Sequence, residues 1–334
     1  MISIILVNWN GWADTISCIQ SLLNSTPEPA RIIVVDNSST DNSMSAFECW
    51  ANGQLELTRL GDEMEHLSLN GASRVRRVKF GRYVETKKSF EGFEYGEEHA
   101  VGPEPIVYFV DSDCNGGFGF GCNVGMRLAD RLGSSAYWLL NNDCVVSRDA
   151  LARVSEAVRS RPKVVFGTVV RFYHHPEAVQ TFGGGTLTRW IRRNRMQDHQ
   201  LLFRQLNFIY GASIAFSSAC RSVVGDFDER IFMYFEEIDF CLRASAEGFV
   251  CDVVEVDVFH KHGGSQGSGS SVGAWMNVFI NKHYVLRKHF GWGAWTVAFY
   301  MSLILRCLFP FTGKNASIGA QRALKVLMSK GAPQ

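Results

Sequence analysis

Short apolar runs alternate with a segment of helical spacing at the start of the chain. Residues 3–7 form a β-rich apolar run, apolar residues recur at helical spacing over 12–23, and residues 32–35 form a second apolar run. This order predicts a βαβ unit. Because such units build sheets with helices packed on them, the pattern favours the α/β class.

The run YWLLNNDCVV, residues 137–146, is apolar and bulky at first and then turns polar at Asn141, Asn142 and Asp143. It predicts a buried strand that delivers polar side chains to a sheet edge, where open α/β sheets collect their ligands. One carboxylate beside two amides suits a hard divalent cation whose other partners are phosphate oxygens and water. A simple turn is the alternative, since Asn and Asp are common in turns.

A second polar segment, DNSSTDNS, follows the apolar run at 32–35. Asp36 stands just past the expected strand, where a carboxylate can accept a hydrogen bond from a base or a ribose. Asp41 or Ser43 can cap a following helix, so a capped loop is the alternative interpretation. No GxGxxG follows the first apolar run, which disfavours a dehydrogenase-type dinucleotide site.

A glycine-rich stretch, NGGFGFGCNVGMRLAD, covers residues 115–130 and continues as a helix-like pattern. Its glycines let the backbone approach a ligand closely, and the helix N-terminus behind them favours an anion. The stretch is therefore a candidate lining of a nucleotide-sugar cleft. A glycine-rich turn made only for tight packing is the alternative.

Composition sets the bounds on these interpretations. With 334 residues, 46% of them hydrophobic and 20% charged, the chain can bury one large core with an appendage, or two domains. A net charge of +1 gives no general case for nucleic-acid binding. The nine cysteines are scattered without a CxxC pair, so neither a disulfide framework nor a zinc site is indicated, and a reducing cytoplasm fits best.

The pattern weakens between about residues 53 and 105, where glycines and charged runs follow one another closely. We interpret this segment as an insertion, closed by prolines before a strand-like run at 106–110. Its basic residues more often form a solvated face than an anion site, and no catalytic role is assigned to them. They are Arg74, Arg76, Arg77, Lys79 and Arg82.

The segment FEEID brings Glu236, Glu237 and Asp239 together behind a bulky apolar run. Like-charge repulsion and partial burial should raise the pKa of at least one of these carboxyl groups. Such a group is a candidate general base. The alternative is an acidic helix N-terminus, with Asp239 paired to Arg243 four residues later.

The character of the chain changes after residue 271. Residues 275–290 look helical and carry several basic side chains, and 292–311 are nearly continuous apolar and aromatic residues interrupted by Arg306. That run is marginal in length for a spanning helix, which needs about 20 apolar residues. Tryptophans and flanking basic residues favour an interfacial helix at the cytoplasmic headgroup boundary. A buried helical hairpin or an oligomer interface is the alternative.

Four motifs in order, ILVNWNG, VVDNSSTDNS, NGGFGFGCNVG and WLLNNDCVV, resemble the family 2 glycosyltransferases of GT-A fold, especially the rhamnosyltransferase-like branch of bacterial surface polysaccharide synthesis. The resemblance implies a Rossmann-like mixed sheet flanked by helices over residues 1–267, with the insertion at about 53–105. A C-terminal helical, membrane-associated segment would follow over 271–334.

The resemblance also implies roles for individual residues. Asp36 would contact the pyrimidine base, the Asn8 region would line the same pocket, and 141–143 would stand at the DXD position, with Asn141 in place of the first Asp. Asp143 and His260 would hold a divalent metal, Mn²⁺ or Mg²⁺, whereas His262 would point to the opposite face of a strand. The implied nucleotide and donor contacts are Asn8, Asp36, Asn115, Gly117, Phe118, Gly119, Asn123, Asn141 and Asn142.

On the acceptor side, family members place the catalytic base in the acidic pair. We favour Glu237, with Glu236 as its close rival, and expect Asp228 and Asp239 to shape the acceptor site. The expected activity is inverting transfer of a sugar from a dTDP- or UDP-sugar, with dTDP-rhamnose first to be tested, to a lipid-linked or growing glycan. The expected location is cytoplasmic, at the inner face of the membrane.

Two other classes of protein remain open. A nucleotidyltransferase-type α/β protein would share the core, but it would need neither the FEEID segment nor the aromatic tail. A binding protein without catalysis would fit the replacement of an Asp by Asn141, and donor hydrolysis above background would exclude it.

Overall fold

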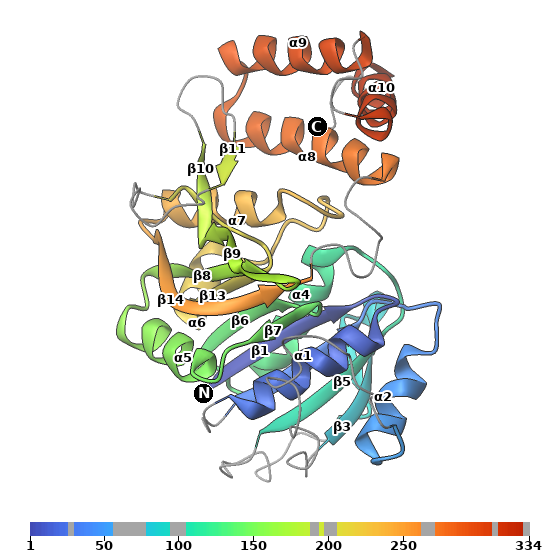
Figure 1. Ribbon diagram of the computed structural model, residues 1–334, viewed down its shortest axis with the longest axis vertical. Helices are drawn as coiled ribbons and strands as arrows, with labels where there is room; N and C mark the ends of the chain where they lie inside the picture. Colours follow the sequence, from blue (N-terminus) through green and yellow to red (C-terminus); the bar gives the residue numbers. More distant parts are fainter. Residues whose placement is uncertain are drawn as a thin grey trace.

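The structure, a computed structural model, describes residues 1–25, 30–55, 78–93, 105–187, 194–196, 206–261, 271–308 and 313–329. These residues form an 11-stranded mixed sheet and a small three-stranded sheet. Helices flank the large sheet on both faces, and three C-terminal helices stack beyond it (Figure 1). The expected mixed α/β architecture is confirmed.

Parallel strands form the centre of the large sheet. In spatial order they are β5 (Ile106–Ser112), β2 (Ala30–Asp36), β1 (Ile2–Asn8) and β6 (Ala136–Asn141). Asn8 pairs in register with Asp36, and Val7 pairs with Asn141. The strand ends that the sequence marks as polar therefore lie in line along one edge of the sheet.

The remaining strands extend the sheet on both sides. On the side of β6 lie antiparallel and parallel strands, β13 (Ser213–Ser217), β8 (Val164–Phe172), β14 (Val250–His260), β7 (Cys144–Val146) and β9 (His175–Phe182). The small sheet consists of β10 (Gly184–Leu187), β11 (Asn194–Met196) and β12 (Phe208–Ile209). Because β7 pairs with the end of β14, His260 lies opposite Cys144, next to Asp143.

The weak pattern over 53–105 predicts a loop-rich insertion, but part of that segment belongs to the main sheet. Strand β3 (Val78–Val84) pairs in parallel with β5, and β4 (Ser89–Glu91) returns antiparallel to β3. Residues 56–77 and 94–104 lie outside the described residues, and with them Arg74, Arg76 and Arg77.

Alternate residues of the central strands feed two separate cores. Ile4 and Ile32 pack on one face with α1 (Trp12–Asn24), α2 (Ser43–Ala51) and α5 (Ala150–Ser160). Ile5 and Ile33 pack on the other face with α4 (Phe118–Arg131), α6 (Ser218–Val224) and α7 (Glu236–Ala246). This burial on both faces explains why the strands read as continuous apolar runs rather than as alternating ones.

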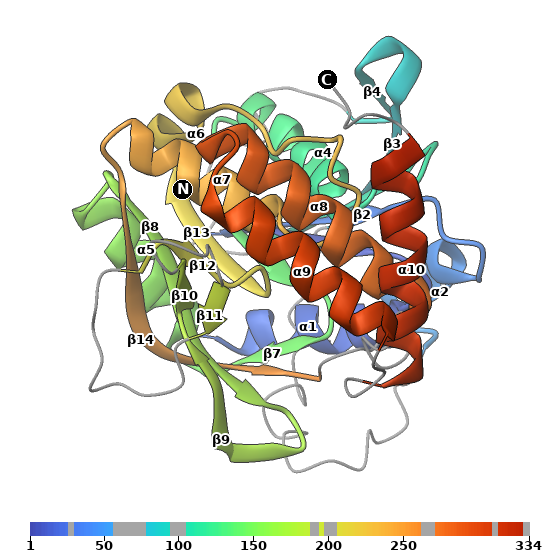
Figure 2. The same cartoon turned by 90° about the horizontal axis from the view of Figure 1, so that it is seen from above.

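The C-terminal helices are α8 (Val272–Phe290), α9 (Ala294–Leu308) and α10 (Lys314–Ser329). Figure 2 shows the three helices from above. They enclose a third apolar cluster that includes Phe279, Phe299 and Leu327. Helix α8 also contributes the fully buried Val285 to the core around α7. Among the helices of the described residues, none has both the length and the apolar character needed to cross a bilayer.

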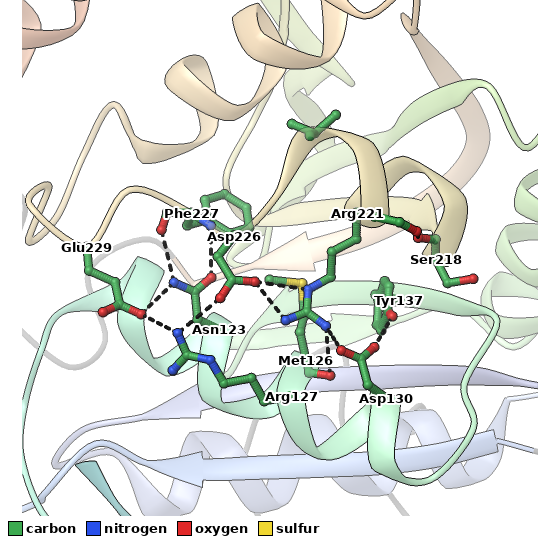
Figure 3. Close-up of polar contacts among 12 residues, drawn as sticks. Asn123, Met126, Arg127, Asp130, Tyr137, Ser218, Arg221, Asp226, Phe227 and Glu229 are labelled. Atoms are coloured by element: carbon green, nitrogen blue, oxygen red, sulfur yellow. Dashed lines mark hydrogen bonds and ion pairs between the residues drawn. The ribbon is translucent and has the colours of Figure 1, made fainter. Parts of the chain in front are cut away.

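A polar cluster joins α4 to residues 226–229, as Figure 3 shows. Asn123 is fully buried and donates from Nδ2 to the Phe227 carbonyl at 3.0 Å and to Glu229 Oε1 at 2.9 Å. Its Oδ1 accepts the Phe227 N–H at 2.9 Å. Both polar atoms of the side chain are therefore used to hold the following loop against α4.

Two arginines complete this cluster. Arg127 pairs with Asp226 at 3.0 Å, and Arg221 pairs with Asp226 at 2.7 Å and with Asp130. Arg221 is mostly buried, so these carboxylates offset the free-energy cost of burying its charge. The loop after α6 is thereby fixed from two helices before it reaches the FEEID segment.

Replacing Asn123 with Ala should lower the free energy of unfolding by about 1–3 kcal/mol, because the Phe227 amide group and Glu229 lose a buried partner. Urea unfolding followed by circular dichroism measures the change. Asn52→Ala makes the same substitution at an exposed site and should stay within about 0.5 kcal/mol of the parent protein. If the two substitutions changed the free energy of unfolding equally, the hydrogen bonds of Asn123 would make no measurable contribution to stability.

Candidate functional site

Asn8 and Asp36 close the carboxyl ends of β1 and β2 side by side. Asn8 Nδ2 donates to Asp36 Oδ1 at 2.6 Å, and both side chains are buried. Ser39 donates to Asp36 from its hydroxyl at 2.6 Å and from its backbone N–H at 3.0 Å. The structure thus places these two predicted donor-binding residues in one corner of the sheet edge.

The two asparagines after β6 point to different neighbours. Asn142 is buried and donates to Thr15 Oγ1 at 2.9 Å, and Thr15 in turn donates to Asn8 Oδ1 at 2.8 Å. Asn142 therefore braces the corner formed by Asn8. Asn141 lies instead beside His260, with its Nδ2 at 3.4 Å from the imidazole Nε2.

Asp143 and His260 meet although they are far apart in the sequence. Asp143 Oδ1 lies 3.2 Å from His260 Nε2, and both residues are buried. The other ring nitrogen, Nδ1, lies 3.1 Å from Gln180 Oε1. If Nδ1 carries the proton and donates it to Gln180, Nε2 has a lone pair that faces the Asp143 carboxylate. Two electron-pair donors that face each other in this way could both bind a cation.

Cys144 is the third residue of this group, which is the one potential metal cluster in the part of the chain that the structure describes. Burial, followed by the charge of Asp143, raises the pKa of the Cys144 thiol well above its usual range. Thiolate sulfur suits softer metals than manganese. One carboxylate oxygen and one imidazole nitrogen remain, a set that fits manganese and leaves room for phosphate oxygens and water.

The glycine-rich loop before α4 is packed tightly against Phe232, in the segment that leads into α7. Gly117 has a φ of 89°, and a Cβ on it would come within 1.9 Å of the Phe232 carbonyl oxygen. The same oxygen accepts a hydrogen bond from the Phe118 N–H at 3.0 Å. Asn115 Oδ1 accepts from the Gly117 N–H at 3.0 Å, which closes the turn.

Two predicted donor-binding positions in this region are committed to protein contacts. A Cβ on Gly119 would meet Phe227 at 3.2 Å and Glu236 at 3.7 Å, so the glycine allows α4 to approach the acidic pair. Asn123 uses both of its polar atoms on residues 227 and 229. The alternative interpretation of the glycine-rich stretch was a turn made for tight packing. At Gly119 and Asn123 the contacts seen are with other parts of the protein, as that interpretation expects.

The acidic pair begins α7. Glu236 is 5% exposed, Glu237 is partly buried, and the Oε2 atom of each is buried without a partner among the described residues. Burial, with the charge of Glu237, raises the pKa of Glu236 well above its usual value. Burial also raises the pKa of Glu237 to about 7, although hydrogen bonds from backbone N–H groups at the start of the helix act to lower it.

Asp228 precedes α7 and Asp239 lies on its first turn, and both bind Lys288 of the C-terminal helix α8. Burial alone would raise the pKa of each, but hydrogen bonds hold both below their usual value. Asp239 is fully buried and contacts Arg243 at 2.9 Å, Lys288 at 2.7 Å and His289 at 2.8 Å. The predicted pairing of Asp239 with Arg243 is therefore present.

A loop between the two halves of the site joins them. Asn141 donates its backbone N–H to the Ala212 carbonyl at 2.9 Å, and a Cβ on Gly211 would lie 3.9 Å from Glu237. Tyr210 lies close enough to both Glu237 and Asp143 for their charges to raise the pKa of its phenol, after burial as the main cause. The ligand pair and the acidic pair thus face the same loop.

Three residues of this site were missed by sequence reasoning. Gln180 lies on an edge strand of mixed pattern, and Tyr210 is one aromatic residue among many, so neither carries a local signal. Asp111 did have one, since it ends a strand in the same way as Asp36, with which it pairs in register. Burial and the charge of Asp36 raise the pKa of Asp111.

Comparison with known proteins finds chains that are similar to this one. Residues 3–63 match the family model Glycosyl transferase family 2. The low-salt glycan biosynthesis hexosyltransferase Agl10 of Haloferax volcanii is 26% identical over 157 residues, which cover 45% of this chain and 50% of that protein. The chain thus spans about half the length of this curated relative.

Solved structures share the fold. GalNAc-T7, crystallised with UDP, GalNAc and Mn²⁺, is 14% identical with a TM-score of 0.59, and the match covers 100% of this chain and 58% of that one. The mannosyltransferase PcManGT from Pyrobaculum calidifontis, in complex with GDP-Man and Mn²⁺, is 12% identical with a TM-score of 0.53, covering 99% and 76%. The predicted GT-A fold is confirmed, and the rhamnosyltransferase-like branch stays a prediction.

Replacing Asp143 with Asn should abolish the Mn²⁺-dependent part of UDP or dTDP binding, because the carboxylate ligand becomes a neutral amide. Gln180→Leu should weaken Mn²⁺ binding by about 10- to 100-fold, since it removes only the partner that orients His260. Calorimetry with and without Mn²⁺ measures both. Asp149→Asn, an exposed acid, is the control. Unchanged Mn²⁺ affinity in Asp143→Asn would remove this residue from the metal site.

Proposed function

We propose that the chain is a family 2 glycosyltransferase that transfers a sugar from a nucleotide-diphosphate donor to a hydroxyl group of an acceptor, as the family match over residues 3–63 and the similarity to Agl10 support. The observation that carries the proposal is the arrangement of the Asp143–His260 pair and the buried acidic pair around one loop, residues 210–212. A ligand pair for a diphosphate-bound cation and a proton acceptor are the two devices that glycosyl transfer requires.

On the donor side, Asp36 would accept a hydrogen bond from the base, with Asn8 and Ser39 holding its carboxylate in place. Asp143 and His260 would hold the metal, which when bound supplies positive charge to the leaving diphosphate. The UDP of one structural neighbour and the GDP-Man of the other support a nucleotide-sugar donor in this fold. dTDP-rhamnose is the donor to test first, on the strength of the motif resemblance.

On the acceptor side, Glu237 would take the proton of the attacking hydroxyl. Its raised pKa keeps the carboxylate basic enough to accept that proton near neutral pH. The acceptor oxygen then forms a bond to the anomeric carbon, and the bond from that carbon to the diphosphate breaks on the opposite face. Attack from that face inverts the configuration at the anomeric carbon and releases the nucleoside diphosphate.

The C-terminal helices favour an acceptor held at a membrane surface. Helix α9 exposes apolar side chains along one face, Val297, Met301, Ile304, Leu305 and Leu308, while its opposite face packs into the helical cluster. Residues 271–334 contain eight Lys or Arg and no Asp or Glu. An apolar face on a positively charged unit suits an anionic bilayer surface, so we propose peripheral attachment there and a lipid-linked or growing glycan acceptor.

The activity is tested by measuring nucleoside diphosphate release from dTDP-rhamnose, UDP-sugars and GDP-mannose with Mn²⁺, with and without a lipid-linked acceptor. Product anomeric configuration, read by NMR, tests inversion. Release from none of these donors, by folded protein that binds Mn²⁺, would contradict the proposed function.

Replacing Glu237 with Gln should lower kcat by about 10²- to 10⁴-fold with little change in donor affinity, because a general base acts on a proton and does not hold the donor. In the parent protein kcat/KM should rise with pH through about 7, since the ionised carboxylate is the active form. Glu236, Tyr210 and Cys241 are the titratable groups near it.

The matched variant for this test is Glu236→Gln, which should be milder and should keep the pH profile. Loss of activity in Glu236→Gln together with retention in Glu237→Gln would move the base by one residue. Normal turnover in both variants would place the base elsewhere.

Replacing Met301 and Leu305 with Glu should weaken binding to phosphatidylglycerol vesicles by about 10-fold or more, because two exposed apolar side chains lose their lipid contact. Co-sedimentation measures this, and binding of the parent should fall with salt. Val223→Glu, an exposed apolar position on α6, is the control. A parent protein that stays in solution with these vesicles but dimerises through α9 would instead identify an oligomer interface.

A further inference from the structure

The backbone that leads into the acidic pair has an uncommon conformation. Tyr234 and Phe235 have φ values of 70° and 78°, in the left-handed region that bulky residues rarely adopt. Each such residue costs about 1–3 kcal/mol and persists only when its surroundings fix it. No side chain caps the start of α7, so the fixing contacts must come from elsewhere.

A single side chain from α8 contacts both peptide groups concerned. Asn281 donates from Nδ2 to the Met233 carbonyl at 2.7 Å and to the Tyr234 carbonyl at 3.2 Å. Each of these carbonyls belongs to the peptide group that enters one of the two left-handed residues. Asn281 is 7% exposed, and an amide nitrogen carries two N–H donors, so both are used here.

The same face of α8 is anchored around this contact. Tyr284 and Lys288 both contact Asp228 at 2.8 Å, and Lys288 also reaches Asp239 at 2.7 Å. Positions 281, 284 and 288 lie three and four residues apart, which places them on one side of the helix. Asn281 is therefore held at a fixed height against the segment before α7.

From the opposite side, the Phe118 N–H donates to the Phe232 carbonyl at 3.0 Å, next to the close approach of Gly117. Residues 232–235 thus have one partner on the donor-side loop and one on the C-terminal helix. Directly after them, Glu236 and Glu237 each keep a buried Oε2 atom without a partner among the described residues. The hydrogen bonds of the Glu237 carboxyl come from the backbone at the start of α7, so its direction follows the conformation of this turn.

We propose that Asn281 is a positioning residue for the general base: by holding the left-handed turn at Tyr234 and Phe235, it fixes where α7 begins and where Glu237 points. The proposal rests on the proposed function, in which Glu237 accepts the acceptor proton. In this proposal α8 positions a catalytic residue, in addition to beginning the segment proposed to attach to the membrane.

The test compares Asn281→Leu, which keeps side-chain size but removes both donors, with Asn277→Leu, the same substitution one turn earlier on α8 at a less buried position. In the ligand-free protein, ¹³C NMR of labelled glutamate carboxyls follows the titration of Glu237, assigned from its absence in Glu237→Gln. In Asn281→Leu the midpoint should fall toward the usual glutamate value, because a displaced carboxyl is less buried.

In the transfer assay, Asn281→Leu should lower kcat by about 10- to 100-fold and leave KM for the donor unchanged, as expected for a misplaced catalytic group. Asn277→Leu should match the parent in both measurements. Asn281→Ser, a smaller polar change, should give the same midpoint shift and is used if Asn281→Leu does not fold.

A folded Asn281 variant with the parental midpoint and kcat overturns the proposal, and so does an equal effect of Asn277→Leu. The NMR measurement needs no substrate, so it separates this proposal from the proposed function. A shifted midpoint in a protein that transfers no sugar would support positioning by Asn281 and contradict glycosyl transfer.

Discussion

A close backbone contact between the turn at Gly117 and Phe118 and the Phe232 carbonyl holds the glycine-rich loop against the segment that leads into α7. The Phe118 N–H donates to the Phe232 carbonyl at the point where a Cβ on Gly117 would come within 1.9 Å of the same oxygen. Only glycine allows this approach, and its φ of 89° adds a second reason for glycine at this position. The glycine-rich loop and the segment before α7 are therefore fixed relative to each other at this contact.

The acidic pair shows how this site departs from the rules that stabilise the rest of the fold. Buried polar atoms are normally paired, but one carboxylate oxygen of Glu236 and one of Glu237 have no partner among the described residues. The cost appears as the raised pKa of each group. Asp228 and Asp239, a few residues away, show the opposite arrangement, because cations surround them and lower their pKa. Carboxyl groups with raised pKa values and carboxyl groups with lowered pKa values therefore lie within the same short segment.

The sequence predicted the parallel core well because buried strands and polar strand ends are local signals. The residues that precede Asn8, Asp36 and Asp143 were enough to place all three at strand ends on one edge of the sheet. Gln180, Tyr210 and Asn281 could not, since each acts through a partner 30 to 80 residues away that no local pattern announces. The strands at 78–91 were missed because charged and glycine residues hid a short edge pairing.

The contacts between α8 and the first turn of α7 also couple the local unfolding of the two helices. If α8 moved away, Asp228 and Asp239 would both lose Lys288, and the turn before Glu236 would lose both amide contacts at once. Detachment of the helix therefore carries the free-energy cost of disordering the acidic segment. In hydrogen exchange, the amides of α8 and of the first turn of α7 should behave as one cooperative unit, although more than 30 residues separate them along the chain.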